Sequence, residues 1–173
     1  AAGIAGILHV GAGEVRRGLA VFERMSAALR RGPSEATFAG PELFHASAHL
    51  MLGNLALSSA AVERDEAATD YATTVRLPIR HAIRAAVLFE RGDWESAVAE
   101  AEASVALSDE LGVAIQSNYS TGVLALVHLF RGDLDAATGI LSTASGGVGM
   151  EWAAWAHAAA AEARGDIPTA AAV

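Results

Sequence analysis

Glu42, His45 and His49 are the residues of this sequence whose types and spacing could form a metal site. Offsets of three and four bring their side chains to one face of a helix. Two imidazoles and a carboxylate are suitable zinc ligands. The spacing supplies no further ligand, however, and alanine-rich helices often carry histidine as partly buried polar packing. The packing interpretation is therefore favoured, and no metal or cofactor is expected.

A second candidate is Gly11-Ala12-Gly13, which follows an apolar stretch and looks like the start of a dinucleotide-binding turn. That motif needs a third glycine where Arg16 stands, and a second strand that ends in an acidic residue about twenty positions on. The stretch 31–35 offers no apolar strand. A short helix, a glycine corner and a helix over 14–31 are therefore favoured over a cofactor site.

Catalytic side chains are scarce in this sequence. His81, His128 and His157 fall within expected helices, but no nucleophile or paired carboxylate accompanies them at a recognisable spacing. No cysteine is present, and all twelve basic residues are arginine, which removes thiolate and lysine chemistry. The chain is therefore predicted not to be an enzyme, and an all-α enzyme or cofactor-binding protein ranks third among the alternatives.

Composition favours packed helices over sheets. Hydrophobic residues make up 53% of the 173 residues and aromatic residues only 6%. A net charge of −8 argues against direct contact with nucleic acid. The apolar start at 1–10 has no basic leader and is too short to cross a bilayer, so a cytoplasmic location without membrane contact is expected. The ends of the sequence suggest a piece of a longer chain.

The tripeptide Arg-Gly-Asp occurs three times, at 91–93, 131–133 and 164–166. Glycine suits the left-handed position that ends a helix, arginine suits the last helical turn, and aspartate caps the next helix. The glycines are separated by 132 − 92 = 40 and 165 − 132 = 33 residues, in the range of helical-hairpin repeats. An integrin-binding signal would need an exposed, flexible loop, so the corners of helical hairpins are the favoured interpretation.

Apolar periodicity predicts about nine helices and a truncated tenth, paired as antiparallel hairpins. The expected ranges are 14–31, 42–57, 63–76, 78–91, 94–111, 113–130, 134–143 and 150–163, after a short helix at the start. Pro41 and Pro78 are expected to open helices, and 113–130 to be central and buried. The predicted fold is all-α, a right-handed stack of helical hairpins in one domain over 1–173.

Residues 78–171 resemble tetratricopeptide-type repeats in their long, degenerate form. The pattern is a small residue within the first helix, then Gly-Asp, a large apolar residue, and alanine three positions later. Its members are Ala85, Ala125 and Ala158; Trp94, Leu134 and Ile167; and Ala97, Ala137 and Ala170. Leu52-Gly53-Asn54 looks like a worn fourth copy, and 13–25 like the second helix of a fifth. Trp94 is expected to pack between the helices of its own hairpin.

The sequence of 88–111, with Leu-Phe-Glu-Arg-Gly-Asp-Trp-Glu-Ser-Ala running into Ser-Asp-Glu-Leu, resembles the repeat region of large ATP-binding LuxR-type transcriptional regulators, which are maltose-regulator-like bacterial proteins. In that family the repeats lie between an ATPase module and a DNA-binding helix-turn-helix, and they act as the sensor or protein-contact region. The 173 residues depart from the family pattern, because they contain neither a phosphate-binding loop nor a basic recognition helix.

The resemblance also implies a binding groove, because the first helix of each tetratricopeptide-type hairpin lines a concave surface. Carried over position by position, the groove residues are Phe89, Tyr119, Leu126, Leu129, Phe130, Trp152 and Trp155. Such a groove suits a protein or apolar peptide, with an apolar small molecule as the alternative. Coverage of these residues by neighbouring helices or a further domain is weighed equally.

The sequence therefore predicts a non-enzymatic protein-interaction or ligand-sensing segment of a bacterial transcriptional regulator. The alternative is a tetratricopeptide-type assembly scaffold without a small-molecule ligand. Self-association through an apolar C-terminal end of the stack is also expected, giving a homo-oligomer.

Overall fold

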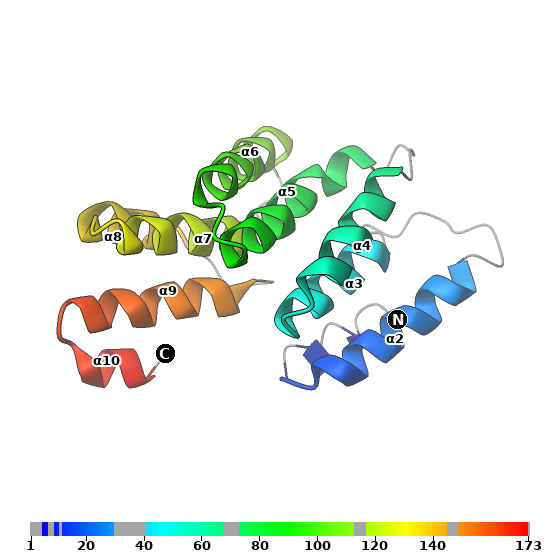
Figure 1. Cartoon of the computed structure of the whole chain (residues 1–173), viewed down its shortest axis with the longest axis horizontal. Coiled ribbons are helices and arrows are strands. Elements are labelled where there is room, and N and C mark those ends of the chain that lie inside the picture. The colour runs from blue at the N-terminus through cyan, green and yellow to red at the C-terminus, as the bar shows by residue number, and fades with distance from the viewer. Residues whose placement is uncertain are drawn as a thin grey trace. The chain divides into compact units, whose positions relative to one another are not determined.

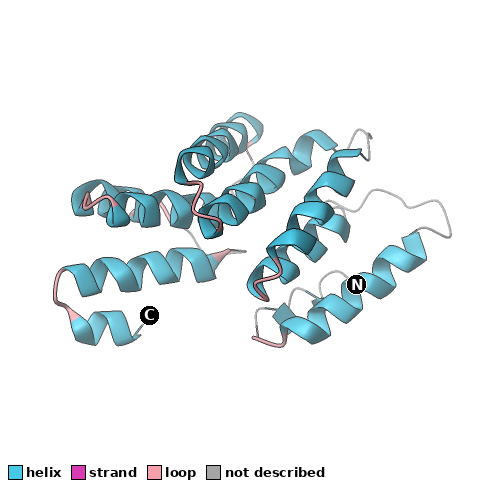
Figure 2. Cartoon of the chain, viewed as in Figure 1, coloured by secondary structure: helices cyan, strands magenta, loops and turns pink. Residues whose placement is uncertain are grey.

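Helices are the only regular elements in the part of the chain that the structure describes (Figure 2). The computed structural model describes residues 5–6, 9–10, 12–29, 41–67, 73–112, 117–144 and 149–172. Its helices, labelled in Figure 1, are α2 (Val15–Leu29), α3 (Pro41–Met51), α4 (Leu55–Ala67), α5 (Thr73–Glu90), α6 (Trp94–Leu111), α7 (Ser117–Phe130), α8 (Leu134–Leu141), α9 (Met150–Ala163) and α10 (Ile167–Ala172). The all-α prediction is confirmed.

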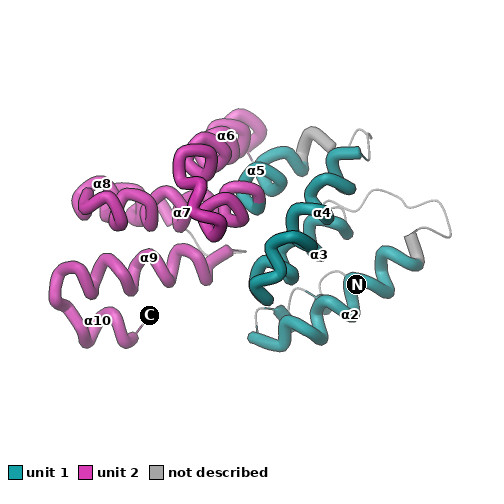
Figure 3. The backbone as a smooth tube through the Cα atoms, viewed as in Figure 1, with its two compact units in different colours: residues 1–83 teal, residues 84–173 magenta. Residues whose placement is uncertain are grey.

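The chain divides into two compact units, residues 1–83 (unit 1) and 84–173 (unit 2), and the boundary falls within α5 (Figure 3). Within unit 1, α3 packs against both α2 and α4. Within unit 2, α7 packs against α6, α8 and α9, and α10 contacts α9. The single domain over 1–173 stays a prediction.

Five helix corners share one hydrogen-bond pattern. In each, a glycine N–H donates to the carbonyl three residues back, and the next N–H donates to the carbonyl five residues back, at 2.8 to 3.0 Å. This pairing is the Schellman motif, which satisfies carbonyls that a helix end leaves free. The glycines have φ of 71° to 82° and are Gly13, Gly53, Gly92, Gly132 and Gly165. The three Arg-Gly-Asp corners and the two worn ones are thus confirmed as corners.

The corners recur at nearly constant spacing. Successive glycines are 53 − 13 = 40, 92 − 53 = 39, 132 − 92 = 40 and 165 − 132 = 33 residues apart. The last interval is short because α8 has 8 residues whereas α6 has 18. A period of about 40 residues lies at the long end of the range for paired-helix repeats.

Aspartate caps the helix that follows each Arg-Gly-Asp corner, as the sequence predicts. The carboxylates of Asp93, Asp133 and Asp166 accept hydrogen bonds from the backbone N–H three residues on, at 3.3, 3.0 and 3.2 Å. Each bond satisfies one of the free amides of a first helical turn. Hydrogen bonding to Thr169 also lowers the pKa of Asp166 below its ordinary value, because it stabilises the ionised carboxylate.

Three expectations for the helices between 42 and 91 are wrong. The expected helix over 42–57 is broken by the Gly53 corner into α3 and α4, and the expected 63–76 helix ends at Ala67. Pro78 does not open a helix but lies inside α5, which begins at Thr73. A proline at this position gives up one backbone hydrogen bond, so the turn before it needs support from side chains.

Each unit has a core built from large residues set among small ones. In unit 1 the buried side chains include Phe22, Leu43 and Val62. In unit 2, α7 is buried from Asn118 to Val127 except at Leu124, so the prediction of a central apolar helix there is confirmed. By contrast, α10 buries none of its six residues. Among the described residues, no helix is both long and apolar enough to cross a membrane.

Candidate functional site: the aromatic cluster of unit 2

Every aromatic residue of unit 2 belongs to one connected cluster of rings, which we call the aromatic cluster. The rings come from the end of α5, the start of α6, both ends of α7 and the first half of α9 (Figure 1). The members are Phe89, Trp94, Tyr119, Phe130, Trp152 and Trp155. All three tryptophans of the chain are among them.

Phe89 lies at the centre of this cluster. Its ring is nearly parallel to those of Trp94 and Phe130, with centroids 6.3 and 6.0 Å away, and these two rings stack on each other at 5.6 Å. Trp152 and Trp155 meet Phe89 edge-on, with centroids at 5.8 and 5.7 Å. Offset-stacked and edge-to-face pairs are the favoured aromatic geometries, each contributing about 0.5–1.5 kcal/mol beyond simple burial.

The corner at Gly92 explains why two of these rings meet. Phe89 lies in the last turn of α5 and Trp94 is the first residue of α6, so the tight corner turns one back onto the other. The cap by Asp93 fixes where α6 begins, since its carboxylate accepts from the backbone N–H of Ser96. Local chemistry over a few consecutive residues therefore sets this stacked pair.

Two glycines, Gly122 and Gly149, allow α9 to pack closely against α7. A Cβ on Gly122 of α7 would lie 2.6 Å from the carbonyl carbon of Trp152, and one on Gly149 would lie 2.5 Å from the ring of Tyr119. Neither distance is compatible with a side chain, so both positions need glycine for α7 and α9 to approach this closely. The close approach places Trp152 against Tyr119, with ring centroids 6.5 Å apart.

The cluster is buried at its centre and open to solvent at two rings. Phe89 and Trp152 are each 6% exposed, whereas Phe130 is 53% and Trp155 is 43% exposed. Because both exposed rings lie within about 6 Å of Phe89, they belong to one patch. Two large apolar rings in solvent, held by a rigid aromatic base, are typical of a recognition surface.

The structure brings together five of the seven residues predicted to line a groove: Phe89, Tyr119, Phe130, Trp152 and Trp155. Leu126 is fully buried and Leu129 half-buried, and neither adds to the exposed patch. The groove itself stays a prediction. Sequence reasoning missed Trp94 as a member of the aromatic cluster. The available signal was its position two residues after a corner glycine, at the same end of the hairpin as Phe89.

Trp94 packs beyond its own hairpin, within which the sequence predicts it to lie. It stacks on Phe89 of that hairpin, as predicted, and equally on Phe130 of α7. Its side chain is half-buried. Trp94 therefore connects consecutive hairpins.

The zinc alternative is not supported where the structure describes the chain. Glu42 Oε2 lies 3.8 Å from His45 Nδ1 and accepts a 2.8 Å hydrogen bond from Arg64 Nε, so an arginine competes for this carboxylate. No group of three potential ligands gathers among the described residues. Burial and the nearby His45 lower the pKa of His49, because both disfavour the charged imidazolium.

His128 and His157 lie on different helices, α7 and α9. His128 Nδ1 lies 3.6 Å from Asp133 Oδ2 at the Gly132 corner, and His157 is exposed on α9. At the start of the chain, His9 and Val10 are helical and Gly13 forms a corner. A strand leading into Gly11–Gly13, which a dinucleotide site requires, is therefore contradicted at these residues.

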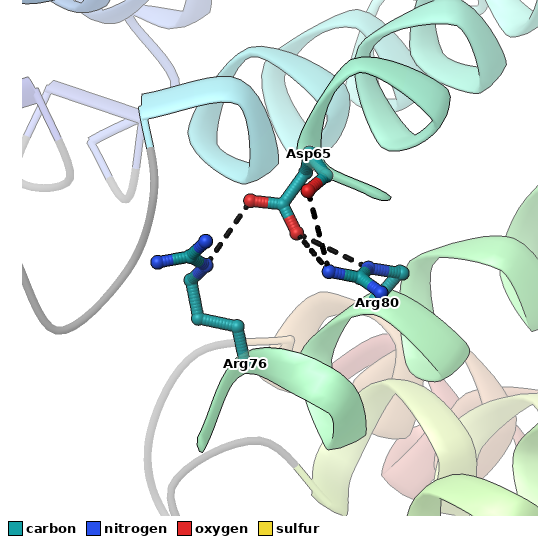
Figure 4. Close-up of polar contacts among 3 residues, drawn as sticks. All are labelled: Asp65, Arg76 and Arg80. Atoms are coloured by element: carbon teal, nitrogen blue, oxygen red, sulfur yellow. Dashed lines mark hydrogen bonds and ion pairs between the residues drawn. The ribbon is translucent and has the colours of Figure 1, made fainter. Parts of the chain in front are cut away.

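Unit 1 contains a buried ionic triad that sequence reasoning also missed: Asp65, Arg76 and Arg80 (Figure 4). Arg80 donates to Asp65 Oδ2 through Nη2 at 2.7 Å and Nε at 3.1 Å. Arg76 Nε lies 3.1 Å from Oδ1. Because Arg76 and Arg80 stand two residues before and after Pro78, one carboxylate holds α5 on both sides of its proline. The triad thus explains how α5 extends to Thr73.

Comparison with known proteins adds no assignment. The chain matches no protein-family model, and no curated protein or solved structure is significantly similar to it.

Proposed function

We propose that this chain is a non-enzymatic interaction segment whose aromatic cluster receives the apolar face of an amphipathic helix from a partner protein. The observation that carries the proposal is the exposure of Phe130 and Trp155 beside the buried ring of Phe89. Rigid aromatic rings supply large contact areas at little cost in side-chain entropy, which is why they dominate the binding energy of interfaces.

The arrangement of helices gives further support. The clustered rings come mainly from α5, α7 and α9, the first helices of successive hairpins, and α7 packs directly on α9. In tetratricopeptide-type stacks these are the helices that line the binding surface, so the sequence resemblance and the ring positions favour the same face. We further propose that the chain is a tetratricopeptide-type repeat. It would form the sensor or contact region of a LuxR-type regulator in the bacterial cytoplasm.

Tryptophan fluorescence tests the proposal directly, because all three tryptophans lie in the aromatic cluster. Titration with an amphipathic helical peptide should shift the emission of Trp155 to shorter wavelength as its exposed ring is covered. Trp155→Ala and Phe130→Ala should each weaken binding by at least about five-fold, since half-exposed rings of this size are typical anchors.

Leu57 provides the matched control. It is 52% exposed, on α4 of unit 1, so Leu57→Ala removes a comparable exposed apolar group that is not a member of the aromatic cluster and should leave affinity unchanged. Peptide binding that is indifferent to Phe130 and Trp155 would rule out this surface. Absence of any peptide binding would favour the alternative, an assembly scaffold in which these rings meet another folded domain.

A further inference from the structure

The net negative charge of the chain comes from one of its two units. Residues 1–83 hold eight arginines and eight acidic residues, so their net charge is zero. Residues 84–173 hold four arginines and twelve acidic residues, giving 4 − 12 = −8. The whole net charge of the protein therefore lies on the unit that carries the aromatic cluster.

Part of this charge lies beside the exposed rings. On α9, Glu151, Trp155 and Glu162 are all exposed. Trp155 follows Glu151 by four residues and precedes Glu162 by seven, offsets that place all three along one face of the helix. Over eleven residues at 1.5 Å each, the two carboxylates stand about 16 Å apart along the helix axis, with the indole between them.

These two carboxylates are free to meet a partner. Neither Glu151 nor Glu162 forms an ion pair within the described part of unit 2. By contrast, the carboxylate of Glu95, next to Trp94, is bound by Arg131. Two unpaired carboxylates thus lie on the same helix face as the exposed ring of Trp155.

We infer that the partner is a cationic amphipathic helix, whose apolar face covers Phe130 and Trp155 and whose arginines or lysines meet Glu151 and Glu162. This inference rests on the proposed function and specifies its partner. Charge complementarity steers such a segment to unit 2 and raises its association rate. Each exposed ion pair adds about two- to five-fold in affinity at low salt, and a basic residue over the indole face adds a cation–π contact.

Three helical peptides of about 18 residues, long enough to span the two carboxylates, test the inference. They share one leucine and alanine face and differ only in the polar face, which carries lysine, glutamine or glutamate. At about 20 mM salt the lysine peptide should bind at least about ten-fold more tightly than the glutamine peptide, and the glutamate peptide should bind most weakly. At about 300 mM salt the advantage of lysine should shrink to about two-fold, because exposed pairs are screened.

Two double variants separate local contacts from the overall charge. Glu151→Gln with Glu162→Gln should bring the lysine peptide close to the glutamine peptide in affinity. Asp109→Asn with Glu110→Gln removes the same charge from the same unit, in the last turn of α6. These residues are exposed and lie about 24 Å along α6 from Trp94, so this pair should have less than about a two-fold effect.

The outcomes distinguish the inference from the proposed function. If the glutamine peptide binds as tightly as the lysine peptide, the cationic partner is refuted while the aromatic surface stands. Equal effects of the two double variants would refute the assignment to Glu151 and Glu162. If none of the three peptides binds, both the inference and the proposed function fail.

Discussion

Replacing Gly132 with alanine isolates the backbone strain of a helix corner from any packing effect. Gly132 has φ of 82°, and a Cβ built there meets no atom within 4 Å. Alanine in this left-handed conformation costs about 1–2 kcal/mol, because its Cβ crowds the following carbonyl oxygen. Alanine also restricts the unfolded chain, which offsets about 0.4–1 kcal/mol of that cost. The expected net loss in the free energy of unfolding is about 1 kcal/mol.

Gly139 supplies a matched substitution of opposite sign. It lies seven residues further on, inside α8, and a Cβ there also meets open space. Because glycine in a helix interior is less stable than alanine by about 0.5–1 kcal/mol, Gly139→Ala should stabilise the protein by that amount. A methyl group added at Gly132 should therefore lower stability, whereas the same group added at Gly139 should raise it, although both sites have room for it.

Urea unfolding followed by circular dichroism measures both variants, with Gly132→Asn as a third. Asparagine tolerates the left-handed region better than alanine, so Gly132→Asn should be the milder change at this corner. In thermal unfolding of a chain of this size, the melting temperature should change by about 2–4 °C for each kcal/mol of stability lost or gained. If Gly132→Ala matches or exceeds the stability of the original protein, the left-handed corner and the repeat register derived from it are wrong.

Three further perturbations test other features by the same unfolding assay. Gly122→Ala should cost about 1–3 kcal/mol and shift tryptophan emission, because its Cβ forces α7 away from Trp152; unchanged emission would argue against the close approach. Asp65→Ala should cost about 3–5 kcal/mol by leaving two buried arginines without their carboxylate, and a loss below about 1 kcal/mol would contradict the burial of the triad. Since the folded pKa of His49 is lowered, the unfolded chain takes up the proton first, so stability should fall as pH drops below about 6.5. His49→Gln should reduce this acid sensitivity.

The corners were predictable from sequence because their chemistry is local. Glycine, the residues three and four before it, and a capping aspartate lie within a few positions of one another, so spacing alone specifies the geometry. Even the worn copy at Gly53 keeps the full hydrogen-bond pattern. Apolar periodicity predicts one helix over 42–57, whereas Gly53 indicates the corner that in fact divides α3 from α4.

The start of α5 was not predictable in the same way. Pro78 signals a helix start by its missing N–H, and only a carboxylate thirteen residues earlier, Asp65, reverses that signal by holding Arg76 and Arg80. Such a pairing depends on how α4 and α5 pack, which residue types do not reveal. The stacking of Trp94 on Phe130 depends likewise on how two helices pack, whereas its contact with Phe89 follows from the local corner.

The shallow attachment of α10 has a consequence for how the protein opens. None of its six residues is buried, and they contact α9 alone among the described helices, so little free energy opposes its detachment. Helices this short are not stable by themselves in water. Backbone amides of α10 should therefore exchange with solvent through local opening, whereas those of α7 should exchange only through opening of the whole unit. Protection should rise stepwise from α10 through α9 to α7, so that unit 2 loses structure from its end inward.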